Sequence, residues 1–409
     1  MAATKNKIMW FLFYALCILR NPDLFLFPRF WAEEGSIYFQ TAYNEGFFNG
    51  LSQVQMGYFS IIPNISTSLA SLFPLKSAPY ICLIIALLIQ SINISLVLNN
   101  KHYFWKSTFN KSILFFSLIF LPFSEEVFLN TICSQFHLQI SVFLLIYFYQ
   151  EKISKTHLFI YLLAFLSGGV GIITFIIFSI FIKKENLKNF RMVFYILLIC
   201  FCLQGFFYFI SYTPRLYSFQ IKYYFQIIFV KHIIGPFFGY ALEDLYHGII
   251  FIKHILIQKK LLVFSQILKI DYLKVLLLIS GVTLFISTVK SVSKNSKLLL
   301  SSLILSIIFI FLSLKNGSES FLFFHGGGRY FYASNFIFYL AFFEILLQTN
   351  HISKIIKQLI LLWFLTIGVY SYFKYPKILV PEVPLQKQTH KRIIQLAPKN
   401  FVLQINLEP

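Results

Sequence analysis

Long apolar runs, separated by short basic clusters, recur along this chain and constrain its fold more than any other feature. A helix that crosses a bilayer needs about 20 mostly apolar residues. Lipid offers no hydrogen-bond partners, so a spanning segment must satisfy its own backbone groups. Hydrophobic residues make up 58% of the chain and charged residues 12%, against roughly 45–50% and about 25% in soluble domains. We therefore predict an all-α fold, a polytopic transmembrane helical bundle.

The bundle is expected to contain about 10–12 membrane segments, some of them short or broken. Residues 1–373 are predicted to form one membrane domain with external loops at 28–77, 124–135 and 315–329. Residues 374–409 are predicted to form a short, extended extracytoplasmic tail. The predicted membrane segments are 8–27, 78–98, 112–123, 136–149, 157–182, 192–212, 226–257, 272–289, 298–314, 330–347 and 358–373.

The basic character of the chain is attributed to membrane topology. The formal net charge is +20, and most of the 35 Lys and Arg residues lie between apolar runs. Cytoplasmic loops carry such an excess of Lys and Arg, which also attracts anionic lipid. Membrane lipid is therefore an expected partner, and no nucleic acid is expected. The five cysteines lie mostly within apolar runs and give no disulfide framework.

Loop charges assign two acidic loops to the same external side. If Lys5 and Lys7 keep the N-terminus cytoplasmic, the first helix delivers residues 28–57 outside, where acidic residues outnumber basic ones. This placement agrees with the positive-inside rule. The next two helices return the chain to the cytoplasm and then out again at the acidic loop 124–135.

The apolar run 157–182 has basic residues at both ends, so the charge rule places both ends in the cytoplasm. About 26 residues are too few for two full crossings. We therefore predict two short helices that meet at Ser167-Gly168-Gly169-Val170-Gly171, where glycine permits unusual backbone dihedrals. The alternative is one long tilted helix that breaks the charge rule.

An acidic and aromatic motif follows the first helix directly. It reads Pro28-Arg29-Phe30-Trp31-Ala32-Glu33-Glu34-Gly35, and Gly57-Tyr58 comes later in the same loop. A carboxylate partly desolvated by the aromatic side chains has the proton affinity that a general base needs to act on an external hydroxyl. The alternative is an interfacial aromatic belt with solvated acids.

This motif resembles the first external loop of the polytopic bacterial glycosyltransferases of the GT-C type. These enzymes use a polyprenyl-phosphate sugar as donor and place a catalytic acid in this loop, commonly within a Glu-Asp-Gly-like motif. Here Glu33-Glu34-Gly35 takes that place, with a glutamate where the family has aspartate. The resemblance implies a GT-C-like bundle with Glu34 as the catalytic base and Glu33 as the second choice. Arg29 and Tyr58 are further candidates for substrate binding.

Two later motifs extend the resemblance. Glu125 and Glu126 resemble residues of the second external loop that hold sugar hydroxyls in such enzymes. Their alternative role is that of a negative charge at a helix N-terminus, which the helix dipole favours. Arg329 and Tyr330 resemble an Arg-Tyr pair that opens a late helix. The guanidinium suits the donor phosphate, and its alternative role is to anchor a helix end at headgroup level.

The chain also resembles the serotype-converting O-antigen glucosyltransferases. This resemblance implies inverting transfer of a hexosyl residue, with glucose as the leading guess, from undecaprenyl phosphate or a related polyprenyl phosphate. The acceptor would be the O-antigen of lipopolysaccharide or another cell-surface glycan, on the external face of the bacterial inner (plasma) membrane. The alternatives are an O-antigen polymerase and a lipid-linked glycan flippase or transporter. No metal or other cofactor is assigned, and a divalent cation is left open, because the cluster Glu243-Asp244-Leu245-Tyr246-His247 lacks further ligands.

Overall fold

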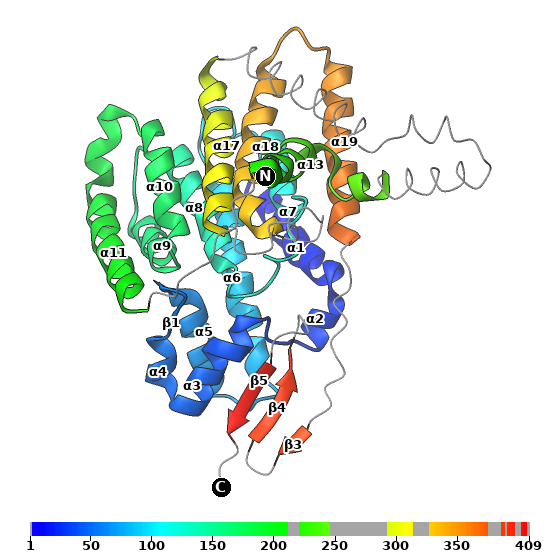
Figure 1. Ribbon diagram of the computed structural model, residues 1–409. Helices are drawn as coiled ribbons and strands as arrows, with labels where there is room; N and C mark the ends of the chain where they lie inside the picture. Colours follow the sequence, from blue (N-terminus) through cyan, green and yellow to red (C-terminus); the bar gives the residue numbers. More distant parts are fainter. Residues whose placement is uncertain are drawn as a thin grey trace, which may run out of the picture. The chain divides into compact units, whose positions relative to one another are not determined.

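The computed structural model describes residues 2–211, 221–245, 293–313, 327–374, 386–388, 391–396 and 402–406. These residues are mainly helical (Figure 1), which confirms a predominantly α fold. Their contacts divide the chain into two compact units, and the predicted boundary between a membrane domain and a tail stays a prediction. Unit 1 comprises Met1–Phe115, Val127–Pro214 and Pro376–Pro409, and unit 2 comprises Phe116–Glu126 and Arg215–Tyr375.

Four helices in the described part of the chain are long and apolar enough to cross a bilayer, which indicates a membrane protein. Shorter apolar helices of 10–17 residues accompany them. The number of crossings stays a prediction, because the predicted segment 272–289 and residues 246–257 lie outside the described residues. The four long helices span Ala78–Asn99, Lys184–Ile210, Gly328–Gln348 and Lys354–Phe373.

Unit 1 begins with two consecutive helices, α1 (Ala2–Arg20) and α2 (Pro22–Leu26). The Asn21 side chain accepts a hydrogen bond from the Leu24 amide, and a proline occupies the first helical position of α2. Both features are typical of a helix start. The local sequence therefore ends α1 and begins α2 within two residues.

The first predicted external loop folds into short elements. Its two short strands form an antiparallel hairpin around Met56-Gly57, whose φ angles are 52° and 84°. Positive φ at both central residues is the requirement of a type I′ turn, which the glycine at the second position makes easy to adopt. The elements are η1 (Glu34–Phe39, a π-helix), α3 (Gln40–Glu45), α4 (Phe47–Leu51), β1 (Val54–Gln55), β2 (Tyr58–Phe59) and α5 (Ile61–Ser71).

Three further helices of the chain are α6 (Ala78–Asn99), α7 (Thr108–Ile119) and α8 (Ser134–Phe148). Buried polar groups join α6 to α8. Asn93 Nδ2 donates to the His137 carbonyl oxygen at 2.9 Å. The His137 ring Nε2 lies 2.8 Å from the Val127 carbonyl oxygen. These bonds fix the segment that precedes α8.

The run 157–182 is broken where the sequence predicted a break. α9 (Lys155–Leu166) and α10 (Val170–Phe178) are separate helices, joined by Ser167-Gly168-Gly169. Gly168 has φ of 78°, a conformation that glycine adopts at no steric cost. α9 and α10 pack against each other, and both pack on α8. We call this pair the helical hairpin.

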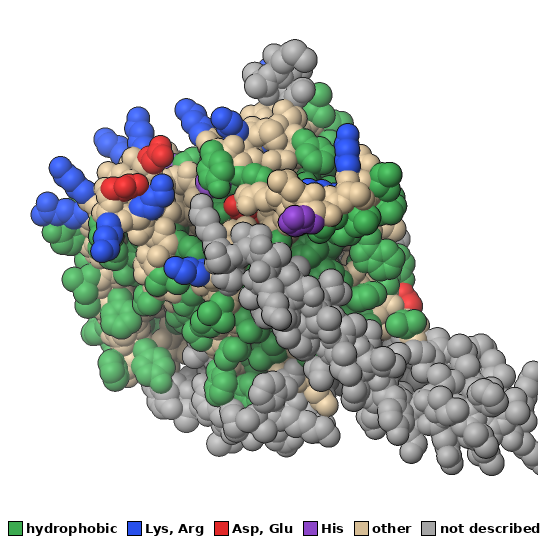
Figure 2. Space-filling view, turned by 90° about the horizontal axis from the view of Figure 1, so that it is seen from above, with side chains coloured by type: hydrophobic (Ala, Val, Ile, Leu, Met, Phe, Trp, Pro, Cys, Tyr) green, Lys and Arg blue, Asp and Glu red, His purple; other side chains and the backbone are tan. Residues whose placement is uncertain are grey.

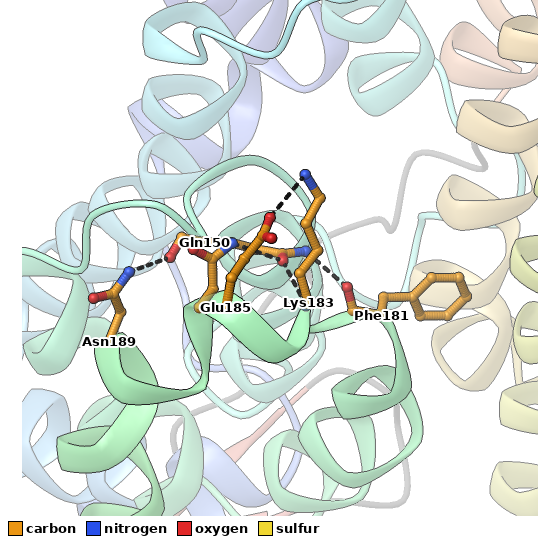
Figure 3. A network of polar contacts seen from close by, with 6 residues as sticks. Gln150, Phe181, Lys183, Glu185 and Asn189 are labelled. Carbon is orange, nitrogen blue, oxygen red and sulfur yellow. Dashed lines mark hydrogen bonds and ion pairs between the residues drawn. The ribbon is translucent and has the colours of Figure 1, made fainter.

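The two ends of the helical hairpin lie together, as the charge pattern predicted (Figure 3). Gln150, which precedes α9, donates through Nε2 to the Phe181 carbonyl oxygen at 2.9 Å and accepts at Oε1 from the Lys183 amide at 3.1 Å. Asn189 Nδ2 donates to the carbonyl oxygens of Gln150 and Glu151, each at 3.0 Å. The chain therefore enters and leaves the helical hairpin at one end, which excludes a single long tilted helix.

Exposed basic side chains cover this end of unit 1. Along the chain, α10 is followed by η2 (Ser179–Phe181), η3 (Lys184–Phe190) and the long helix α11 (Arg191–Ile210). Figure 2 shows Lys and Arg side chains gathered at one edge of the face that it presents. Large hydrophobic side chains of α11 are also exposed, as expected for a helix that faces lipid. The exposed basic residues are Lys152, Lys155, Lys183, Lys184, Lys188 and Arg191.

The C-terminal segment, predicted to be an extended tail, forms a three-stranded antiparallel sheet in the order β3-β4-β5. Asn44 Nδ2 donates to the Gln404 carbonyl oxygen at 2.9 Å, and the Gln404 amide donates to Gln40 Oε1 at 2.8 Å. A Cβ at Gly35 would lie 2.5 Å from Leu396 Cδ1. The sheet therefore packs on the first predicted external loop. Its strands are β3 (Gln386–Gln388), β4 (Lys391–Gln395) and β5 (Val402–Asn406).

Unit 2 is built on helices from the second half of the chain. α17 and α18 pack against each other, and α13 packs on α19. Inside the unit, His232 Nδ1 lies 2.8 Å from Asn335 Oδ1, and Asn335 Nδ2 donates to the Lys231 carbonyl oxygen at 2.9 Å. The helices are α12 (Ile221–Ile228), η4 (Phe229–Ile234, a π-helix), α13 (Gly235–Phe238), α17 (Ser293–Ser313), η6 (Gly328–Phe331), α18 (Tyr332–Gln348) and α19 (Lys354–Phe373).

Candidate functional site

Glu34, the residue predicted to be the catalytic base, lies at the start of the π-helix η1 and is 2% exposed. Its Oε2 accepts a hydrogen bond from the Trp31 amide at 3.0 Å. Its Oε1 accepts from the Thr131 amide at 2.9 Å and from the Thr131 hydroxyl. Because Thr131 belongs to the second predicted external loop, the carboxylate joins the two acidic loops within unit 1.

Burial dominates the electrostatics of Glu34. Desolvation raises the pKa of its carboxyl above the ordinary value, since the charged form loses its hydration. The bonds from Thr131 and Trp31 and the positive charge of Arg29 oppose this effect without cancelling it. The Arg29 guanidinium also lies 5.1 Å from the centre of the Trp31 ring. A carboxyl with raised proton affinity in a fixed orientation has the two properties of a general base.

Glu33 lies in a different environment from its neighbour. It is half-buried, and it and Tyr58 both act electrostatically on the buried hydroxyl of Tyr38. Burial, then Tyr58 and then Glu33, raise the pKa of Tyr38. Glu33 is therefore in contact with solvent, whereas Glu34 is enclosed.

The strand β2 places Tyr58 at the tip of the helical hairpin. The Gly168 amide donates to the Phe59 carbonyl oxygen at 2.9 Å, and Ser60 and Ser167 form an isolated antiparallel bridge. Gln204 of α11 accepts at Oε1 from the Phe59 amide at 3.0 Å and donates through Nε2 to the Phe59 carbonyl oxygen at 2.9 Å. The backbone beside Tyr58 is thus held from two sides.

In unit 2, the Glu126 carboxylate lies at a helix start, and its binding of sugar hydroxyls stays a prediction. Its Oε2 accepts from the Arg329 amide at 3.2 Å. Arg329 lies in η6, which continues into α18. A negative charge at this helix start is stabilised by the unpaired amides and by the helix dipole.

Arg329 and Tyr330 are both half-buried and contact each other. Arg329 Nη2 donates to the Tyr330 hydroxyl at 3.2 Å, and the guanidinium lies 5.1 Å from the centre of the Tyr330 ring. The preceding Gly327 has φ of 67°, a left-handed conformation that favours glycine. His325 and Gly326, which precede Gly327 in the sequence, lie outside the described residues.

Lys231 is the residue that sequence reasoning missed as a site residue. It is 0% exposed, and its Nζ lies 4.5 Å from the centre of the Phe123 ring. Its positive charge attracts the carboxylates of Glu125 and Glu126. Burial raises the pKa of the Glu125 carboxyl, and the Lys231 ammonium opposes that rise. An ionisable side chain within an apolar segment signals function in a membrane protein, and the sequence Phe229-Val230-Lys231-His232-Ile233 carried that signal.

The predicted site residues thus fall into two groups. Unit 1 holds Arg29, Glu33, Glu34 and Tyr58, and unit 2 holds Glu125, Glu126, Arg329 and Tyr330. Within the described ranges, no three His, Cys, Asp or Glu residues are grouped as metal ligands, and His247 of the weighed metal cluster lies outside these ranges.

Comparison with known proteins gives no relative: no family model, curated protein or solved structure matches this chain.

Proposed function

We propose that this chain is a membrane glycosyltransferase of the GT-C type. It transfers a hexosyl residue, with glucose as the leading candidate, from a polyprenyl-phosphate sugar to an O-antigen or another cell-surface glycan. The reaction takes place on the external face of the bacterial inner membrane. One observation carries the proposal: a buried, hydrogen-bonded carboxyl of raised pKa lies where the family resemblance expects the catalytic acid.

The proposed mechanism begins with Glu34. Its Oε1 accepts two hydrogen bonds, whereas its Oε2 accepts one, from the Trp31 amide, and keeps a lone pair. That lone pair takes the proton from the acceptor hydroxyl as the hydroxyl oxygen attacks the anomeric carbon. The bond from the anomeric carbon to the phosphate oxygen breaks, and the polyprenyl phosphate leaves with the electron pair.

From the sequence resemblance alone, we assign the departing phosphate to Arg329. Its guanidinium supplies paired donors for phosphate oxygens, and the Tyr330 hydroxyl, 3.2 Å from Nη2, holds its orientation. A single displacement attacks the face opposite the leaving group, so the product has inverted configuration at the sugar carbon. Retained configuration in the product would contradict direct attack.

The experiment is reconstitution of the purified chain into proteoliposomes with radiolabelled polyprenyl-phosphate hexoses and O-antigen acceptor. Glu34→Gln is expected to lower kcat by about 10²–10⁴, the usual contribution of a general base. Glu33→Gln, the same substitution one residue earlier, is the matched control and should retain kcat. Arg329→Ala should slow release of the phosphate. Full transfer by Glu34→Gln, or an equal loss of kcat in both glutamate variants, would overturn the assignment of Glu34.

A second candidate function is transport of a lipid-linked glycan. The helical hairpin supports it, because two short helices joined by an irregular segment are a recurrent feature of transporter sites. Proteoliposomes loaded with fluorescent lipid-linked oligosaccharide separate the two functions. Movement of the lipid between leaflets without transfer of sugar would favour transport over glycosyl transfer.

A further inference from the structure

Polar side chains from two segments of unit 1 meet at the tip of the helical hairpin. A Cβ at Gly168 would lie 2.6 Å from Gln135 Oε1 and 3.4 Å from Tyr58 Cδ2, so both side chains face this glycine. Gln135 and Tyr58 are both partly exposed. We call these two residues, with Gly168-Gly169, the hairpin-tip cluster.

Buried hydrogen bonds hold the backbone of the cluster in place. Gln204 is 8% exposed and binds both the amide and the carbonyl oxygen of Phe59, the neighbour of Tyr58. A third bond runs from Gln204 Nε2 to the Phe165 carbonyl oxygen at 3.2 Å. One side chain of α11 therefore fixes β2 against α9, which pre-organises the cluster for a ligand.

Space remains at the tip itself. Gly169 is partly exposed, and a Cβ built on it meets no atom within 4 Å. Its φ of −75° suits any residue. Gly168, in contrast, is buried, has positive φ and leaves room for Gln135. The two glycines thus differ: Gly168 allows the side chains to converge, and Gly169 leaves the surface beside them open.

We infer that the hairpin-tip cluster is the subsite that binds the sugar ring, with the Gln135 amide on its hydroxyls and the Tyr58 ring against its apolar face. This inference rests on the proposed function and extends it. A side-chain amide offers both donors and an acceptor to the hydroxyls of a hexopyranose, and an aromatic side chain offers a flat apolar surface with a polar end. Gln204 is a positioning residue for this subsite.

The test uses a pair of glycine variants. Gly169→Ala adds a methyl group to the open tip without strain in the free protein, and Gly205→Ala adds one to α11, where a Cβ also meets no atom within 4 Å. We expect Gly169→Ala to raise KM for the sugar donor by at least about tenfold with little change in kcat. The added methyl group would clash with the bound sugar, and a loss of about 1.4 kcal/mol of binding free energy lowers affinity tenfold. Gly205→Ala should match the wild type. Gln135→Ala should raise KM about three- to tenfold.

Binding is measured separately in the Glu34→Gln background, by displacement of a radiolabelled polyprenyl-phosphate hexose from proteoliposomes. Gly169→Ala should weaken binding there as well, and Gln204→Leu should weaken binding without contacting the sugar. If Gly169→Ala and Gly205→Ala bind the hexose equally, the inference is wrong, even if the wild type transfers sugar. If the wild type binds the hexose through the cluster but transfers nothing, the inference stands and the proposed function fails.

Discussion

Glu34 in unit 1 and Glu125 in unit 2 are both buried, and different kinds of partner stabilise their charges. Glu34 is 2% exposed and accepts its hydrogen bonds from neutral donors, the Trp31 and Thr131 amides and the Thr131 hydroxyl. Glu125 is 6% exposed, and the largest influence opposing the effect of its burial is the positive charge of Lys231, whose side chain is 0% exposed. Neutral donors orient a carboxyl in either protonation state, whereas attraction between two buried charges acts only while both charges are present. Glu34 therefore suits proton transfer, and Glu125 suits a structural anchor.

The largest expected effect on stability comes from removing the Lys231 charge that attracts Glu125 in unit 2. Lys231→Met keeps an apolar side chain of similar length but leaves the buried Glu125 without that attraction. Removing one of two buried opposite charges costs about 3–5 kcal/mol. Unfolding by denaturant in detergent micelles measures the loss. The double variant Lys231→Met/Glu125→Gln should recover much of it, and a single variant as stable as the wild type would show that the two charges do not depend on each other.

A smaller loss is expected from the neutral donors in unit 1. Thr131→Val removes the hydroxyl that bonds to Glu34 and keeps the side-chain shape, which should cost about 1.5–3 kcal/mol, the range for a bond to a charged group. Thr156→Val, at an exposed threonine, is the matched control. The variant should also move the acid limb of the pH profile of kcat/KM to higher pH, because a bond to the charged form is lost. If the acid limb of this pH profile does not move, Glu34 is not the catalytic base.

The pH dependence of stability should differ between wild type and Glu34→Gln. Because folding raises the pKa of Glu34, the folded state binds more protons than the unfolded state. The contribution of this group is fully present below its unfolded pKa and is lost as pH rises through its folded pKa, by at most about 1.4 kcal/mol per pH unit. Unfolding midpoints measured across this range should show the decline in the wild type. A decline of the same size in Glu34→Gln would assign it to other groups.

The smallest effect is expected where an ion pair is open to solvent. Lys374 Nζ pairs with Asp244 and lies 4.0 Å from Glu243 Oε2, and the Asp244 side chain is 50% exposed. Screened pairs contribute about 0–1 kcal/mol, so Lys374→Met should cost far less than Lys231→Met in the same unfolding assay. A cost as large as that of Lys231→Met would mean that burial is not what distinguishes the two lysines.

Local patterns predicted much of this molecule, and distant pairings set the rest. The break at Gly168 was predictable because basic residues at both ends of a short apolar run are a local signal. Glu34 was predictable from its motif, but its partner Thr131 was not, since the two residues are 97 positions apart and only the tertiary fold joins them. The C-terminal strands were missed for the same reason, because their support comes from Gln40 and Asn44. Lys231 was missed because its contact with Phe123, more than 100 positions earlier in the sequence, is set only by the tertiary fold.

The C-terminal sheet has a consequence for the order of events during synthesis. Asn44 and its partner Gln404 are 360 positions apart, and Leu396 packs directly on Gly35, the neighbour of Glu34. The ribosome must therefore translate β5 before the surroundings of Glu34 are complete. During insertion into the membrane, the growing chain carries its first loop without this cover, so the surroundings of Glu34 are complete only after Gln404 has been made.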